Sequence, residues 1–449
     1  MPAMRTPARP GTARSVVVTL VCVGVLAAMT TIARRYGFST LDLDRAAAGS
    51  WLGGDGLYAY RSPVSHLGTA LPPPAAVLTA PAAFLPLAVA GWALALAGLA
   101  ALGLALVALA GPVARRYGRR RWPVVLAVGA LALTIEPVRA SLGLGTLDLV
   151  AFGLVTADIV ALRRGAWARS RELWWPGHRP FAGSPLHRLR ATGGWAGVGV
   201  GLATALTVGP AFFIAYLMLT RQWRPALTAL ATTATTATAA VLITPHESAA
   251  WLGEVLWRLD RTGPVDAPGN QSLGGVFARL YDSASTPLLV WLSFAMLLVA
   301  VGLIRARSAH ADGDEVTAFT LVGLTAAGTG PVTGTHEVLW MLPAMLVLVD
   351  TAARRRAEAR GGVPGRPRFP GAGLATAAGL TYLLLVLAPM WSLSDAFSRN
   401  SYALAMIVLV NALPWRPAAA PAFPVNRWLH RRPATATIPP PREPLVRGS

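Results

Sequence analysis

Long apolar runs recur along the whole chain, and they constrain its fold more than any other feature. A helix that spans a bilayer needs about 20 mostly apolar residues. Only 13% of the 449 residues are charged, whereas soluble domains carry about 25%. The sequence therefore predicts an all-α polytopic membrane protein. We expect ten spanning segments, at 15–33, 88–111, 123–139, 146–163, 225–243, 286–305, 316–330, 337–352, 372–390 and 401–414.

One further apolar run, 195–219, is interrupted by Gly209-Pro210. Proline removes a backbone donor and clashes with the preceding turn of a helix. The freed backbone groups are tolerated within a membrane where other parts of the protein cover them. We therefore predict a re-entrant pair of half-helices that enters and leaves the membrane on the same side.

Arginine clusters give the predicted bundle a direction. The formal net charge is +20, and arginines gather between the apolar runs at 114–121, 163–190, 221–224, 305–307, 354–360 and 427–432. Ten crossings plus the re-entrant pair place all these clusters on one side, together with both termini. By the positive-inside rule that side is the cytoplasm, so we expect a plasma-membrane (inner-membrane) protein. Arg34 and Arg35 are the exception, because they fall on the outer side.

The basic charge does not indicate a nucleic-acid partner. A nucleic-acid-binding protein carries its basic residues over a polar surface, whereas here they lie in short clusters between apolar runs. Such clusters orient a membrane protein and contact anionic membrane lipid.

The chain divides into three predicted parts. Residues 1–14 form a cytoplasmic N-terminus, 15–415 a single transmembrane domain with long outer loops at 34–74 and 244–285, and 416–449 a basic, Pro-rich tail expected to be disordered in the cytoplasm. The first apolar run lacks a convincing small-residue cleavage site, which favours an uncleaved helix. The single cysteine, Cys22, allows neither a disulfide nor a cysteine-based metal site within one chain. We expect no metal ion and no cofactor.

Two carboxylates follow the first apolar run. Asp42 and Asp44 fall near the outer membrane surface, where a carboxylate can act as general base towards a sugar hydroxyl. The alternative is an acid at a helix N-terminus, stabilised by the helix dipole.

A second group of ionisable residues lies at membrane depth or at its outer edge. Glu136, Arg139 and Asp148 belong to it, and charged groups at such depth are costly unless they are paired or functional. Glu136 and Arg139 are three residues apart, so on a helix they can pair with each other. An ion pair and a binding site therefore both remain open.

The remaining candidates lie further along the chain. Asn270, Gln271 and Ser272 in the second outer loop carry amide and hydroxyl groups suited to sugar hydroxyls or phosphate oxygens. His336, next to Glu337, is placed either to bind an anionic group or to form a local hydrogen-bonded pair.

Taken together, these segments resemble glycosyltransferase family 87, the polyprenol-phosphate-mannose-dependent α-1,2-mannosyltransferases of actinobacterial envelopes. The resemblance covers roughly residues 15–415, in the family's order and spacing. The matching residues are Asp42-Leu43, 54–58, Leu71-Pro72-Pro73, Glu136-Pro137, 145–148, 201–210, Arg261, Gly263, 270–273, Gly275, Arg279, Leu280, 330–337 and Trp340.

The resemblance implies a fold, a donor and an acceptor. The fold is the GT-C type, with many membrane helices and an active site at their outer face. The donor is a polyprenyl-phosphate-linked sugar, most simply mannose, and the acceptor is a glycolipid or lipoglycan. In an inverting transfer Asp42 would accept the acceptor's proton, and Asn270, Gln271 and Ser272 would line the sugar pocket.

Five positions depart from the family pattern. Leu71, Thr146, Asp148, Thr207 and Glu337 stand where the pattern has Tyr, Gln, Asn, Lys and a second His. With the lysine replaced, Arg139, Arg279 or His336 becomes the candidate cation for the donor phosphate.

The same departures keep another class of function open, a catalytically impaired relative that binds lipid-linked sugar or scaffolds envelope assembly. A transporter ranks last, because neither repeated halves nor a charge pair at mid-membrane is present in the sequence.

Overall fold

The computed structural model describes residues 10–174, 184, 191–258, 261, 263–282, 287–360, 371–387 and 395–416. All regular elements in these ranges are helices, which confirms the all-α prediction. They are α1 (Pro10–Tyr36), α2 (Ser39–Leu52), α3 (Pro73–Thr79), η1 (Ala80–Phe84), α4 (Leu87–Arg116), α5 (Arg121–Ala132), α6 (Glu136–Leu144), α7 (Asp148–Trp174), α9 (Val198–Leu206), α10 (Ala211–Leu219), α11 (Trp223–Ile243), α12 (Pro245–Gly253), η2 (Val255–Trp257), α13 (Leu273–Leu280), α14 (Leu288–Ala311), α15 (Glu315–Thr329), η3 (Thr335–Trp340), α16 (Met341–Arg360), α17 (Ala372–Val386), α18 (Ala396–Arg399) and α19 (Ser401–Ala412).

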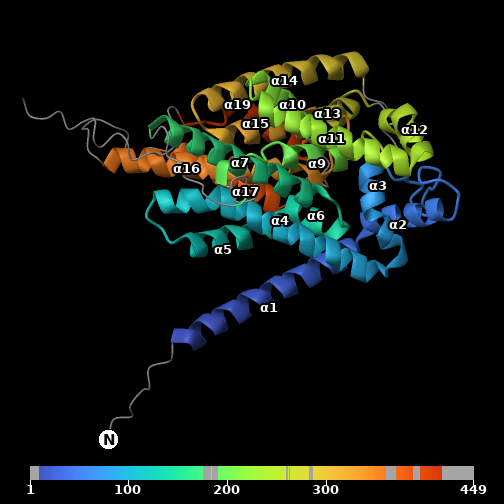
Figure 1. Cartoon of the computed structure of the whole chain (residues 1–449), viewed down its shortest axis with the longest axis horizontal. Coiled ribbons are helices and arrows are strands. Elements are labelled where there is room, and N and C mark those ends of the chain that lie inside the picture. The colour runs from blue at the N-terminus through green and yellow to red at the C-terminus, as the bar shows by residue number, and fades with distance from the viewer. Residues whose placement is uncertain are drawn as a thin grey trace, which may run out of the picture.

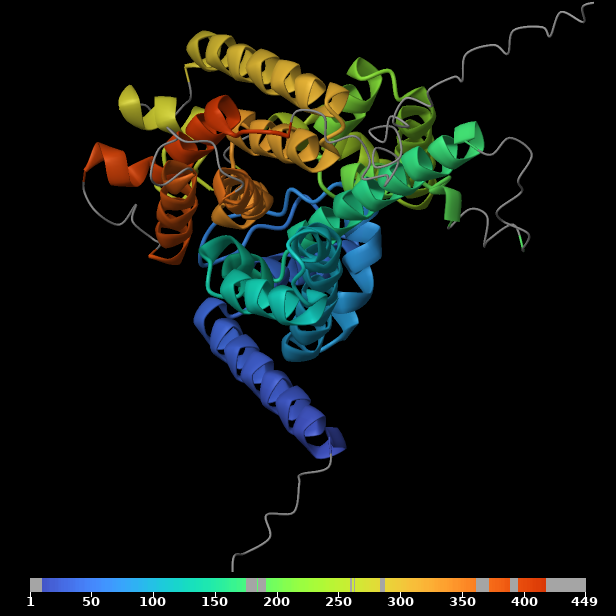
Figure 2. The ribbon, with the colours of Figure 1, turned by 90° about the vertical axis from the view of Figure 1, so that its left-hand side faces the viewer.

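The long helices lie roughly side by side in one bundle, and α1 extends away from it in both views (Figures 1 and 2). Within the described ranges, five helices are long and apolar enough to cross a membrane, or six if the bent pair α5–α6 is one span. Two further apolar helices in these ranges, α17 and α19, are shorter than a full span. The chain is therefore a multi-pass membrane protein, and the count of ten crossings stays a prediction.

The predicted span 123–139 is not one straight helix. α5 and α6 are bent by 73° relative to each other. Ile135, before α6, is extended, and Pro137 occupies the first turn of α6. Pro137 lacks the N–H that would bond to the Leu133 carbonyl oxygen, and its ring clashes with that carbonyl, so α5 does not continue through it. The predicted loop 34–74 also has more regular structure than expected, because it contains α2 and the beginning of α3.

The apolar run 195–219 is broken where the sequence predicted, since α9 ends at Leu206 and α10 begins at Ala211. The return of both halves to the same side of the membrane stays a prediction. Glycines let α9 approach its neighbours closely. A Cβ atom on Gly199 would lie 2.1 Å from the Leu154 carbonyl oxygen of α7, and one on Gly201 would lie 2.5 Å from the Ala229 carbonyl oxygen of α11. Such contacts between small residues are typical of helices packed within membranes.

A buried carboxylate fixes the beginning of α9. The Oδ2 atom of Asp158, on α7, accepts a hydrogen bond of 2.7 Å from the Val200 backbone N–H. The first N–H groups of a helix have no partner within the helix, so Asp158 supplies one from the neighbouring helix.

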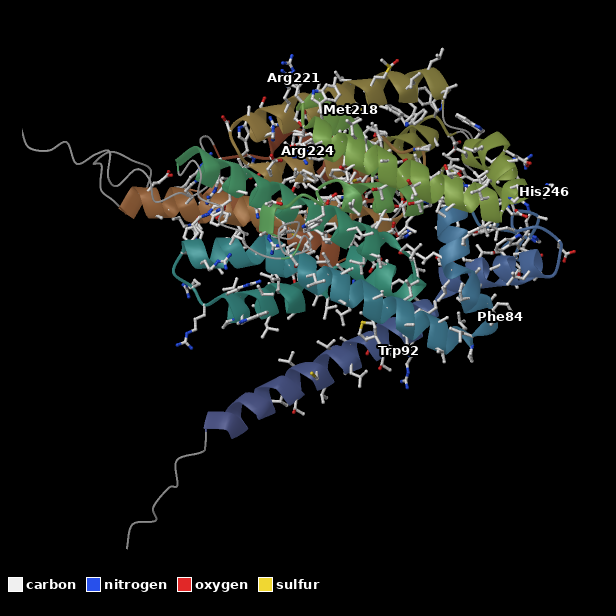
Figure 3. All side chains as sticks on the ribbon, viewed as in Figure 1. Phe84, Trp92, Met218, Arg221, Arg224 and His246 are labelled. Carbon is white, nitrogen blue, oxygen red and sulfur yellow. The ribbon has the colours of Figure 1, made fainter. Side chains whose placement is uncertain are left out.

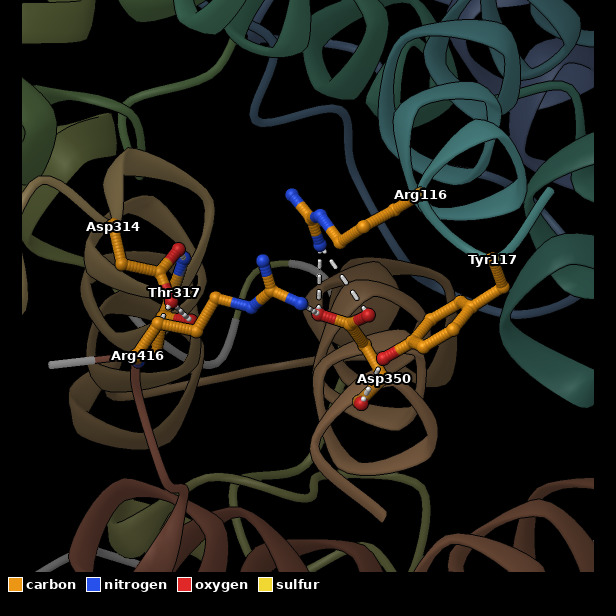
Figure 4. Close-up of polar contacts among 6 residues, drawn as sticks. All are labelled: Arg116, Tyr117, Asp314, Thr317, Asp350 and Arg416. Atoms are coloured by element: carbon orange, nitrogen blue, oxygen red, sulfur yellow. Dashed lines mark hydrogen bonds and ion pairs between the residues drawn. The ribbon is translucent and has the colours of Figure 1, made fainter. Parts of the chain in front are cut away.

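Arginines and carboxylates join several helices at one end of the bundle (Figure 4). Asp350 on α16 pairs with Arg116 of α4 at 3.0 Å and with Arg416, beyond α19, at 2.8 Å. The backbone N–H of Arg416 also donates to Asp314, which caps α15. Three helix ends thus meet here. They are the ends of α4 and α16, which carry predicted cytoplasmic arginine clusters, and the segment that follows α19.

The other end of the bundle carries α2, α3 and α12 (Figure 1). Arg221 and Arg224 lie at the opposite end of α11 from His246, which is in the first turn of α12 (Figure 3). The two ends of α11 therefore differ as predicted, with arginine at one and the second outer loop at the other.

Candidate functional site

Asp42 and Asp44 both lie on α2 but have different surroundings. The Asp42 side chain is 56% exposed and pairs with Arg45 at 3.5 Å. Asp44 is partly buried and accepts a hydrogen bond of 2.7 Å from the Thr69 hydroxyl. Burial raises the pKa of Asp44 to about 6, although the Thr69 hydrogen bond opposes this shift. Of the two carboxylates, Asp44 has the environment of a tuned acid–base group.

The segment that carries Thr69 is held by the second outer loop. Arg261 donates to the carbonyl oxygens of Thr69, at 2.6 Å, and of Tyr58. Trp251 donates to the Ala70 carbonyl oxygen at 3.3 Å. Glu247 accepts from the Leu57 N–H. Two loops far apart in sequence thus form one layer over α2, and the Thr69 hydroxyl is fixed beside Asp44.

Asp148 and His336 meet at the beginning of α7. The His336 Nε2 atom lies 3.8 Å from Asp148 Oδ2, and both side chains are partly buried. The imidazole ring is folded over Gly334, where a Cβ atom would lie 2.5 Å from its Cε1 atom. Glu337 accepts a hydrogen bond of 2.6 Å from the Gly334 N–H. His336 is therefore flanked by two carboxylates, one in sequence and one in space.

A small apolar cluster links the segment around Thr69 with the segment around Asp148. It is formed by Ala75, Leu147 and Leu206. Leu71, two residues after Thr69, packs against this cluster, and Leu147 directly precedes Asp148. Leu206 ends α9, so Thr207, which replaces the lysine of the family pattern, lies at the same level. The Thr207 hydroxyl donates to the Ala203 carbonyl oxygen of its own helix.

Glu136 and Arg139 form an ion pair of 3.0 Å inside the protein. Glu136 also accepts a hydrogen bond of 2.6 Å from the Tyr36 hydroxyl of α1, and Arg139 donates to the Val386 carbonyl oxygen of α17. These contacts join α1, α6 and α17, so the structure favours the ion-pair alternative for both residues.

Asn270, Gln271 and Ser272 are almost fully buried and hold a loop in place. The Asn270 amide donates to the carbonyl oxygens of Val265 and Pro331. Gln271 donates to the carbonyl oxygens of Pro268 and Arg399 and accepts from the Tyr402 N–H. The Ser272 hydroxyl caps α13. Their polar atoms are engaged within the protein, which favours a structural role; the predicted sugar-lining role remains untested.

Arg279 is likewise engaged. Its guanidinium donates to the carbonyl oxygens of Ala267 and Asn270 and to the Asn400 side chain. Burial lowers the pKa of Arg279 to about 10. Of the three cations considered for the donor phosphate, Arg139 and Arg279 are hydrogen-bonded within the protein. Among the described residues His336 has an ion-pair contact with Asp148 at 3.8 Å, which is longer than a hydrogen bond.

The sequence did not single out Thr69, and it identified Arg261 only as a motif position. A signal for Thr69 exists only in retrospect, since it lies two residues before Leu71-Pro72-Pro73. Within the described ranges, no three His, Cys, Asp or Glu side chains gather in a way that could hold a metal ion.

Comparisons with known proteins find one matching family and several similar sequences. The model of glycosyltransferase family 87 matches residues 71–330. A polyprenol-phosphate-mannose-dependent α-(1-2)-phosphatidylinositol mannoside mannosyltransferase of Mycobacterium tuberculosis is 28% identical over 331 residues, which are 70% of this chain and 71% of that protein. Its namesake of Mycolicibacterium smegmatis is 28% identical over 245 residues, covering 53% of this chain and 49% of that protein.

One solved structure is also similar. It is a crystal structure of ArnT from Cupriavidus metallidurans bound to undecaprenyl phosphate, with 16% sequence identity and a TM-score of 0.39. The similarity covers 88% of this chain and 76% of that chain.

Proposed function

Because the chain belongs to glycosyltransferase family 87, we propose that it transfers mannose from polyprenyl-phosphate-mannose to a phosphatidylinositol mannoside, forming an α-1,2 linkage. The relatives' names state this donor, linkage and acceptor for those proteins. The observation that carries the proposal to this chain is Asp44, a partly buried carboxylate hydrogen-bonded to Thr69, whose backbone is held in turn by Arg261.

In the proposed reaction, a hydroxyl oxygen of the acceptor attacks the anomeric carbon of the donor mannose. A new C–O bond forms while the bond between that carbon and the phosphate oxygen breaks, with inversion. The bonding electron pair leaves with polyprenyl phosphate. The hydroxyl proton passes to the carboxylate of Asp44, which acts as general base. Asp42, which is exposed and paired with Arg45, is the second candidate for this role.

His336 is the proposed contact for the donor phosphate. Imidazole donates a hydrogen bond when neutral and adds a positive charge when protonated. The Asp148 carboxylate lies 3.8 Å from the His336 Nε2 atom. This arrangement offers a cation near the level of Thr207, where the family pattern places lysine.

We also propose the orientation of the chain in the plasma membrane. The network of Arg116, Asp350 and Arg416 would face the cytoplasm, and Asp44 and His336 the outer side. The convergence of arginine-bearing helix ends supports this direction.

The test is a membrane assay with polyprenyl-phosphate-mannose and a phosphatidylinositol mannoside. Wild-type protein is expected to transfer mannose, and Asp44→Asn to lose about 100-fold or more in kcat, the usual contribution of a general base. Asp42→Asn is the matched control on the same helix and is expected to retain most activity. Wild-type turnover in Asp44→Asn would refute the assignment of the base. Donor binding without transfer by the wild-type protein would instead favour the impaired, scaffold-like relative.

A further inference from the structure

Two adjacent arginines, Arg34 and Arg35, lie in the last turn of α1. Both are exposed, and neither has an ion-pair partner among the described residues. Other arginines near this end of the bundle are engaged, for example Arg45 with Asp42 and Arg139 with Glu136. Arg34 and Arg35 are therefore available to an anion from outside the chain.

The last turn of α1 is held firmly against the bundle. The Tyr36 ring lies against Gly143, where a Cβ atom would be 2.4 Å away, and its hydroxyl donates to Glu136. The Phe38 ring lies against Gly91 in the same manner. The Arg35 guanidinium sits 5.5 Å from the centre of the Tyr36 ring. The backbone beneath both arginines is thus fixed, although the rest of α1 extends away from the bundle (Figures 1 and 2).

The position of these arginines is unfavourable for topology. In the proposed orientation they lie on the outer side, against the bias that keeps arginine in the cytoplasm. The C-terminal dipole of α1 stabilises a nearby cation only modestly. The end of a spanning helix lies at the depth of lipid headgroups, where phosphodiesters are the available anions.

We propose that Arg34 and Arg35 bind the phosphodiester of the acceptor lipid. This inference rests on the proposed function, in which the acceptor is a phosphatidylinositol mannoside. Its phosphate is separated from the reacting mannose hydroxyl by an inositol ring and by sugar. Both arginines lie on α1 whereas Asp44 lies in the second turn of α2, so the arginines and the base belong to different helices. The donor phosphate, in contrast, is bonded directly to the reacting carbon and must lie beside the base.

The experiment compares two acceptors in membranes that contain the full-length protein. One is a phosphatidylinositol mannoside, and the other is a long-chain alkyl α-mannoside, which has no phosphate. We expect the double variant Arg34→Ala/Arg35→Ala to raise the KM for the phospholipid acceptor about 10- to 100-fold, as the loss of charged hydrogen bonds implies. The KM for the alkyl mannoside, the KM for the donor and kcat are expected to stay within about twofold.

Two further variants separate binding from folding and from general membrane attraction. Arg34→Lys/Arg35→Lys keeps both charges and is expected to recover most of the phospholipid affinity. Arg119→Ala/Arg120→Ala removes two exposed arginines from the turn between α4 and α5 and is expected to leave both KM values unchanged.

The outcomes are distinct. An equal effect on both acceptors, an effect on the donor KM, or no effect at all would overturn the inference while the proposed function stands. Failure of the wild-type protein to mannosylate either acceptor would overturn the proposed function itself.

Discussion

Replacing Thr69 with valine tests how the proposed base is tuned. The Thr69 hydroxyl donates a hydrogen bond of 2.7 Å to Asp44, and this bond favours the ionised carboxylate. Valine has nearly the same shape but no hydroxyl, so the variant removes the hydrogen bond without a large change in packing. The pKa of Asp44, about 6 in the native protein, is expected to rise further.

The size of the effect follows from the bond that is lost. A hydrogen bond to a charged group contributes about 1.5–3 kcal/mol, which changes an ionisation constant roughly 10- to 100-fold. A general base must be unprotonated, so activity is present above its pKa and is lost as the pH falls through it. At pH 7 about nine-tenths of native Asp44 is ionised, and in Thr69→Val only about a tenth to a half. The rate at pH 7 should therefore fall about two- to tenfold and recover towards pH 9.

The assay is the initial rate of mannose transfer at subsaturating acceptor, measured from pH 5 to pH 9. The native acid limb is expected near pH 6, the Thr69→Val limb at higher pH, and the Thr69→Ser limb at the native position because serine keeps the hydroxyl. An unchanged acid limb in Thr69→Val, or a loss of rate that does not recover at high pH, would refute the reasoning.

Two other predictions concern the packing and ion pairs of the helices. Gly201→Leu places a side chain where even a Cβ atom would lie 2.5 Å from the Ala229 carbonyl oxygen. The thermal unfolding temperature of this variant in detergent should therefore fall, at a cost of about 1–3 kcal/mol. Gly103→Leu, at a site with no atom within 4 Å, is the control, and equal unfolding temperatures of the two variants would contradict the packing argument. Asp350→Ala removes the carboxylate that pairs with the largely buried Arg416 and with the more exposed Arg116. The variant should destabilise the protein by about 1–3 kcal/mol, mainly through Arg416, which is more than the loss of an exposed pair. A change below about 0.5 kcal/mol would show that the network adds little.

The architecture was largely predictable because apolar runs and arginine clusters report directly on membrane helices. The helix break at Gly209-Pro210 was also predictable, since proline acts locally on its own helix. The bend between α5 and α6 was not predicted, although Pro137 caused it by the same local effect. The apolar run continues through the bend, and hydropathy does not record a change of direction.

The candidate site was less predictable, because it depends on contacts between distant segments. The sequence pattern identified Asp42 and Asp44 together. The structure distinguishes them, because only Asp44 accepts a hydrogen bond from Thr69, whose backbone is held by Arg261. Asn270 and Gln271 were chosen for their amide chemistry, yet the same chemistry satisfies buried carbonyl groups. A polar motif alone does not reveal whether its partner is a ligand or the protein's own backbone.

The pairing of Asp350 with Arg116 and Arg416 also affects how the chain is made. Arg116 is synthesised before Asp350, but Arg416 follows it by roughly 65 residues, which at 5–20 residues per second takes about 3–13 s. During that interval the ends of α4 and α16 can already associate, while the segment after α19 is still absent. Closure of the network therefore marks the arrival of the last membrane helix, and a chain truncated before Arg416 would be released with this junction open.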